Sequence, residues 1–249
     1  MSIALSIFYL SKSAFTQAPS TIVLDSIHSR YLQEKRLISI YLPPNFQRNK
    51  AYEIIYCTDG QTIIDFYKSD VDSLIAIQKF PELIMVGIHS NEQLIERTDL
   101  QYRNYEYVEG FGGKKDKRFE HHYSFFTKEV IAYVEQTYAI AKRRFFYGTS
   151  NGAGFGVSVS AGNPSLFDIY ICLSMGGGNY KSLKRSKPDS PFFYLGYGKK
   201  EPVPFVIASQ DFGDYLSKKK YQYQLKVYDG GHDRNDWKKV FLEVIPTFF

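Results

Sequence analysis

Cysteine is scarce in this sequence of 249 residues: only Cys57 and Cys172 occur, in the apolar runs EIIYCTDG and IYICLSM. No CxxC pair is present, and no set of cysteines and histidines has the spacing of a zinc site. The pattern excludes a disulfide-rich scaffold, and it predicts no metal site. Both cysteines are expected to be small buried hydrophobic residues.

Long apolar runs and an excess of one charge are also missing. No run approaches the length of a membrane span. The net charge is only +5, and the basic residues gather in two short runs, 114–118 and 218–220, which are typical of a solvated loop and a helix end. Nucleic-acid binding would need a broader basic face and a known module, so no nucleic-acid partner is predicted. The mild positive field favours an anionic substrate.

The first 19 residues, MSIALSIFYLSKSAFTQAP, leave two interpretations open. The apolar stretch from Ile3 to Leu10 is followed by small residues that suit a cleavage region, but no Lys or Arg precedes it, as a signal peptide requires. The segment is either the tail or first strand of a cytoplasmic protein, or a weak signal-like segment of an exported, periplasmic one.

Apolar runs rich in β-forming residues recur along the rest of the chain, with helical patterns between them. Several runs are almost continuously apolar, as strands covered on both faces are. This alternation predicts an α/β fold with a mostly parallel central sheet and helices on both faces. No linker divides the chain, so residues 20–249 are expected to form a single domain. The predicted strands are 20–27, 36–43, 53–58, 82–88, 143–148, 168–174, 191–196 and 223–229, and the clearest helical patterns are 119–140, 201–220 and 235–249.

A serine stands between two glycines in GTSNG, residues 148–152. The segment fits G-x-S-x-G, follows the apolar run RRFFYG and precedes a helix of small residues. On such a strand-to-helix turn the Ser150 hydroxyl projects above the sheet edge, and small residues let the helix lie close to the strands. Ser150 is therefore predicted to be a catalytic nucleophile.

A serine nucleophile needs a base, and the order on this scaffold is serine, acid, histidine. His232 is the only one of the five histidines that follows Ser150. It is the predicted base, and the other four histidines are expected to be structural. Glu201, shortly after the run PFFYLG, is the predicted acid, with Asp211 and Asp214 further on as alternatives.

At these residues the chain resembles the putative-esterase family of the α/β-hydrolases, which includes enterochelin (ferric siderophore) esterases, feruloyl-esterase-like enzymes and esterase D. The likeness covers about residues 20–249. Its most specific parts are GKKEP (198–202) and DGGHDRNDW (229–237), and YCTDGQ (56–61) and RNYEY (103–107) also resemble family elements. Many relatives have a second glycine where this chain has Ala153.

The resemblance implies Ser150 as nucleophile, His232 as base and Glu201 as acid. It also implies that the backbone N–H groups of Asn151 and Gln61 form the oxyanion hole. Arg103 matches a basic residue near the substrate entrance of the family. In LQYRNYEYVEGF, tyrosines such as Tyr105 interleave with Arg103, so both residues are predicted to bind substrate. The alternative is a structural Arg103 paired with Glu106.

These observations predict a serine carboxylic-ester hydrolase that needs no cofactor. Its expected substrate is a small-molecule ester that is siderophore-like, feruloyl-like or otherwise aromatic or anionic. Two other functions stay open: an acyltransferase that uses the same residues, and a binding protein that kept the fold without the chemistry. The sequence does not determine the oligomeric state.

Overall fold

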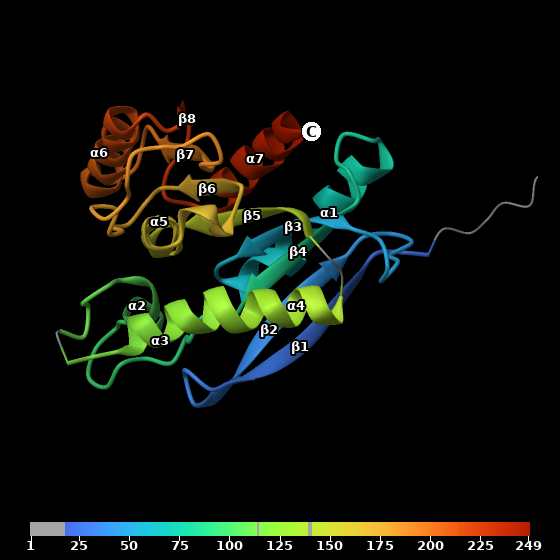
Figure 1. Cartoon of the computed structure of the whole chain (residues 1–249), viewed down its shortest axis with the longest axis horizontal. Coiled ribbons are helices and arrows are strands. Elements are labelled where there is room, and N and C mark those ends of the chain that lie inside the picture. The colour runs from blue at the N-terminus through green and yellow to red at the C-terminus, as the bar shows by residue number, and fades with distance from the viewer. Residues whose placement is uncertain (1–17, 114, 139–140) are drawn as a thin grey trace, which may run out of the picture.

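The computed structural model of the protein describes residues 18–113, 115–138 and 141–249. Within these residues one sheet of eight strands has the order β1-β2-β4-β3-β5-β6-β7-β8 (Figure 1). Each strand overlaps one of the eight predicted runs, so the strand prediction is confirmed. The strands are β1 (Thr21–Ser29), β2 (Glu34–Leu42), β3 (Tyr52–Cys57), β4 (Leu83–Ile88), β5 (Ala141–Thr149), β6 (Ile169–Leu173), β7 (Phe192–Gly198) and β8 (Tyr223–Tyr228).

The sheet is mostly parallel, as predicted. Every neighbouring pair from β4 through β3 to β8 is parallel, whereas β2 pairs antiparallel with both β1 and β4. Because parallel strands end at the same edge of a sheet, the loops that follow β3, β5, β7 and β8 meet there. The residues predicted for catalysis all lie on these loops.

Helices cover both faces of the sheet, which confirms the predicted fold class. Figure 1 shows α5 and α6 on one side of the strands, and α1 and α7 on the other. The helices are α1 (Gly60–Ala76), α2 (Arg103–Tyr107), α3 (Arg118–Ser124), the π-helical η1 (Phe125–Val130), α4 (Ile131–Thr137), α5 (Asn151–Gly162), α6 (Val203–Lys219) and α7 (Arg234–Val244), with 3-10 turns η2 (Pro164–Leu166) and η3 (Ile245–Phe248). None of the helices in these described segments is long and apolar enough to cross a membrane.

Two hydrophobic cores lie on the two faces. One contains the side chains of α3 to α6, with Phe126 and Phe155 in contact at its centre. The other contains α1 and α7, where the ring of Phe241 lies 4.7 Å from that of Tyr147 on β5. Cys57 and Cys172 are buried free thiols, as predicted, and burial raises the pKa of both. The cores hold the loop-bearing ends of the strands in fixed positions.

Four features depart from the sequence analysis or lie beyond it. The helical pattern at 119–140 is interrupted by the π-helical turn η1. Helix α1 was not among the predicted helices, and the long polar segment after β4 contains the short helix α2. The predicted N-terminal tail or signal-like segment, residues 1–19, lies outside the described residues except for its last two positions.

Candidate active site

Ser150 occupies a strained turn between β5 and α5. Its backbone has φ +56° and ψ −130°, a conformation that residues other than glycine adopt rarely and at a cost of about 1–3 kcal/mol. Gly148 is required here because a Cβ at this position would lie only 2.6 Å from the Gly152 carbonyl oxygen. The amide N–H of Gly176 donates to the Ser150 carbonyl at 3.0 Å and helps to hold the turn. The serine is therefore the N-cap of α5, at the edge of the sheet.

His232 lies on the loop between β8 and α7 and reaches across to this serine. Its Nε2 atom is 3.0 Å from the Ser150 Oγ atom. Two aromatic side chains fix the imidazole: the ring centre of Phe205 is 4.1 Å away, and that of Trp237 is 4.8 Å away in edge geometry. In the tautomer with a proton on Nδ1, the hydroxyl of Ser150 donates to Nε2, as a base would require.

Glu201 follows β7 and lies behind the histidine. Its Oε2 atom is 3.6 Å from His232 Nδ1, and its Oε1 atom accepts hydrogen bonds from the Gly198 amide at 3.0 Å and the Tyr228 hydroxyl at 2.9 Å. Burial acts to raise the pKa of Glu201, but the contacts with His232 and the surrounding donors outweigh it, so the pKa is lower than usual. The alternatives, Asp211 and Asp214, are exposed on α6.

Ser174, a residue that sequence reasoning missed, supports the carboxylate. Its hydroxyl hydrogen bonds to Glu201 Oε1 and lies 2.9 Å from the Tyr228 hydroxyl, and it accepts the indole N–H of Trp237 at 2.6 Å. Ser174 is fully buried and has φ +54°. The sequence did contain one indication of this role: Ser174 directly follows β6, the strand beside β5, and so lies at the same sheet edge as Ser150. Ser174 thus connects the acid to the tryptophan that packs on His232.

Asn151 and Gln61 begin two helices at the same sheet edge. Asn151 is the first residue of α5, and Gln61 is the second residue of α1. The N–H groups in the first turn of a helix have no partner within that helix, and the helix dipole makes them good donors to an anion. Gln61 and Ser150 line the same cleft. This arrangement is chemically suited to holding a negative charge that develops next to the serine.

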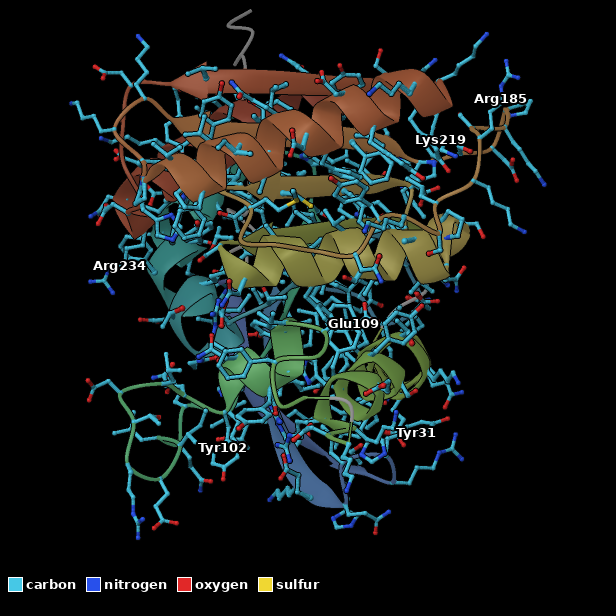
Figure 2. All side chains as sticks on the ribbon, turned by 90° about the vertical axis from the view of Figure 1, so that its left-hand side faces the viewer. Tyr31, Tyr102, Glu109, Arg185, Lys219 and Arg234 are labelled. Carbon is cyan, nitrogen blue, oxygen red and sulfur yellow. The ribbon has the colours of Figure 1, made fainter. Side chains whose placement is uncertain are left out.

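A cleft of about 300 Å³ opens beside Ser150. Aromatic side chains from α1 and α7 line one part of it, and charged side chains lie around them. One of the charged residues is Arg234, which Figure 2 shows at one end of the molecule. Arg185 and Lys219 lie at the opposite end, away from Arg234. The lining residues are Asp59, Gln61, Thr62, Ile63, Phe66, Tyr67, Glu92, Gln101, Arg103, Thr149, Ser150, Arg234 and Trp237.

The two residues predicted to bind substrate are placed differently. Arg103 lines the cleft, but its guanidinium makes a two-pronged salt bridge with Asp59, at 2.6 and 2.8 Å, and not with Glu106. Tyr105 is not among the residues that line the cleft, and its ring packs against Phe111 with 5.1 Å between ring centres. The structure thus brings Arg103 to the cleft, whereas the Tyr105 side chain on the same helix, α2, lies outside the cleft lining.

The other histidines do not contact Ser150 in the described part of the chain. His89 Nε2 lies 2.8 Å from the Ser39 hydroxyl, His28 and His121 are exposed, and His122 is fully buried among aromatic rings. Across residues 18–113, 115–138 and 141–249, no cluster of three or more acidic, histidine or cysteine side chains could hold a metal ion.

A mostly parallel sheet between two helical layers, with a serine on the turn after β5 and a histidine within hydrogen-bond distance, defines an α/β-hydrolase. Residues 29–179 match the family described as "Putative esterase", and the chain belongs to that family. It is accordingly a serine ester hydrolase. The matched region contains Ser150 and ends before Glu201 and His232.

Similar proteins agree with this fold. The uncharacterized protein YjcH of Bacillus subtilis (strain 168) is 23% identical over 237 residues, which cover 87% of this chain and 92% of that protein. A solved structure of a ferulic acid esterase aligns with a TM-score of 0.74 at 20% identity, covering 92% of this chain and 97% of the other. The siderophore hydrolase EstA from Aspergillus nidulans aligns with a TM-score of 0.71 at 13% identity, covering 99% of both chains. At these identities the structures establish the shared fold.

Proposed function

We propose that the protein hydrolyses carboxylic esters through a Ser150–His232–Glu201 triad and an acyl-enzyme. The observation that carries the proposal is the 3.0 Å contact between His232 Nε2 and Ser150 Oγ, made by residues from two separate loops. The carboxylate of Glu201 on the far side of the imidazole supports it. Acyl transfer by a serine requires a nucleophile, a base beside it and an acid that orients the base, in this spatial order.

Each group has a defined task in the proposed reaction. Ser150 Oγ attacks the ester carbonyl carbon while its proton moves to His232 Nε2, and the carbonyl electron pair moves to the oxygen. The N–H groups of Asn151 and Gln61 stabilise this oxyanion. When the intermediate collapses, the alcohol leaves with the proton from His232. A water molecule, deprotonated by His232, then attacks the acyl-enzyme and releases the acid.

The cleft supports an ester with an aromatic or anionic part. Phe66, Tyr67 and Trp237 provide aromatic surfaces that can stack on a catechol or feruloyl ring. Arg234 forms no salt bridge with any described residue, and its guanidinium lies 5.2 Å from the Phe66 ring centre. An unpaired guanidinium over an aromatic face can bind the carboxylate or catecholate oxygens of a substrate whose ring stacks on that face. A ferulic acid esterase and a siderophore hydrolase share this fold, which is consistent with this substrate class.

Active-site labelling combined with a substrate screen tests the proposal. A fluorophosphonate probe is expected to add to Ser150, which peptide mass spectrometry would locate, and Ser150→Ala is expected to lose both label and esterase activity. The screen uses p-nitrophenyl esters of increasing length, a feruloyl ester and a ferric catecholate trilactone. Label on another residue, or an active Ser150→Ala enzyme, would reject the triad. Products transferred to added acceptor alcohols in preference to water would instead identify an acyltransferase.

A further inference from the structure

Helix α2 consists of only five residues, RNYEY, yet it contacts the loops that carry both oxyanion-hole candidates. It belongs to the long polar segment between β4 and α3. Three of its side chains reach the turn before α1 or the start of α5, and a fourth is buried in an ionic cluster beneath it.

The first loop is held at Asp59, the residue before α1. The Arg103 guanidinium binds both carboxylate oxygens of Asp59, and the Asp59 backbone N–H donates to the Tyr107 hydroxyl at 3.2 Å. Asp59 has φ +56° and ψ +42°, a left-handed conformation that costs a residue other than glycine free energy. Gln61 follows two residues later. The conformation at Asp59 therefore decides where the Gln61 N–H points.

The second loop is held at Asn151. Its side-chain amide donates to the Asn104 side-chain oxygen at 2.9 Å. Asn151 follows the strained Ser150 directly, and its backbone N–H is the other oxyanion candidate. One helix of five residues thus fixes both donor loops, although they are separated by about 90 positions in the sequence.

The helix itself is anchored from below by Glu106. This carboxylate is fully buried and pairs with Arg36 on β2 and with Arg118 at the start of α3, the latter at 2.8 Å. It also accepts the Asn91 backbone N–H at 3.1 Å. Burial alone would raise the pKa of Glu106, but its charged and polar neighbours lower the pKa to about 2, so it stays ionised. The anchor keeps α2 in one position on the sheet.

We infer that α2 positions the oxyanion hole, and that Arg103 and Asn104 are its positioning residues. This inference rests on the proposed function, because it assigns these side chains to the stabilisation of that reaction's oxyanion. Donors of an oxyanion hole act on charge that develops in the transition state, so a small displacement lowers kcat more than it changes substrate binding. A binding role for Arg103 would instead raise KM for anionic esters alone.

Kinetics of Arg103→Ala and Arg103→Lys on a neutral and an anionic aromatic ester separate these roles. Positioning predicts that Arg103→Ala lowers kcat on both esters by a similar factor, about tenfold to a hundredfold, with KM nearly unchanged. Lys keeps the charge but loses the two-pronged geometry, so only part of kcat should return. Arg185→Ala removes an exposed arginine that lies outside the cleft lining and far from Arg234 (Figure 2), so it is the matched control and should behave as wild type.

Asn104 provides a second test on the other donor. Asn104→Leu removes the acceptor for the Asn151 amide and is expected to lower kcat, whereas Asn104→Asp keeps an oxygen there and is expected to recover most of it. Phenylboronic acid, which forms a tetrahedral adduct with a reactive serine, should bind each variant more weakly in proportion to its kcat. A role in folding alone would lower Tm and leave kcat and boronate affinity intact at temperatures well below Tm.

The inference fails if kcat and boronate affinity are unchanged in both Arg103→Ala and Asn104→Leu, or if Arg103→Ala raises only KM for the anionic ester. Failure of the proposed function is a different result. In that case the wild-type protein would not be labelled at Ser150 by the fluorophosphonate, or Ser150→Ala would stay active.

Discussion

His232 Nδ1 and Glu201 Oε2 lie 3.6 Å apart, and both atoms are buried without any other hydrogen-bond partner among the described residues. The separation is slightly longer than a hydrogen bond, and such bonds often shorten when substrate binds. A cationic imidazole would draw the carboxylate closer. The pair is therefore arranged to stabilise the charge that His232 gains when it accepts the serine proton.

Glu201→Gln is expected to lower kcat, but by less than Ser150→Ala or His232→Ala. The amide keeps the shape of the side chain and removes the charge that stabilises the imidazolium, whereas the other two changes remove the nucleophile or the base. Steady-state kinetics of Asp211→Asn and Asp214→Asn are the controls, because both residues are exposed on α6. A larger loss in either aspartate variant would move the acid there.

Ser174→Ala is expected to reduce both stability and kcat. The change leaves the indole N–H of the half-buried Trp237 without its acceptor and removes one donor from Glu201. An unpaired buried polar group costs about 1–3 kcal/mol, and in a protein of this size each kcal/mol lowers Tm by about 2–4 °C. Thermal unfolding and kinetics measure the two effects. Unchanged values of both would show that Ser174 does not support Glu201, and Ser186→Ala on an exposed loop is the control.

Stability is expected to fall as the pH drops from about 6.5. Burial lowers the pKa of His122 to about 3 from an ordinary 6.5, so in this range the unfolded chain binds a proton that the folded one does not. Each such proton reduces the unfolding free energy by up to about 1.4 kcal/mol per pH unit. Glu106, with its pKa lowered to about 2 from 4.5, contributes stability above about pH 4.5 that is lost as the pH falls toward 2.

Urea unfolding at pH 7, 6 and 5 checks the histidine part of this prediction. His122→Phe keeps an aromatic ring in contact with Tyr107 and Phe155 and is expected to flatten the pH dependence. His121→Gln, at the exposed neighbouring position, should keep the wild-type slope. Equal slopes in wild type and His122→Phe would place the proton uptake at another group.

Arg234→Ala is expected to raise KM for an anionic aromatic ester and to leave a neutral ester unaffected. The side chain is exposed, and exposed ion pairs are worth about 0–1 kcal/mol, so the expected rise is about twofold to fivefold. The difference should shrink at high salt, which screens exposed charges. Lys239→Ala, on the same helix but outside the cleft lining, is the control. Equal effects on both esters would argue against anion recognition by Arg234.

The sequence by itself determined the strands and the fold class, and it predicted His232 as the base for Ser150. The apolar runs are nearly continuous because the strands are covered on both faces. The signal for each strand is therefore spread over a whole run of residues. The glycines around Ser150 reflect a local steric need, which a short motif can encode. His232 followed from chain order on the scaffold, and the contact between Nε2 and Oγ is consistent with that reasoning.

Only the tertiary structure decided the partners of the polar side chains around the site. Arg103 pairs with Asp59, 44 positions away, although Glu106 is three positions along the chain. Ser174 joins Glu201 to Trp237, and Arg234 forms no salt bridge with any residue of the described segments. A charged or hydroxyl side chain can bind any suitable partner within reach, so sequence distance gives little guidance. Packing of the strands and helices brings particular loops together, and that packing selects each partner.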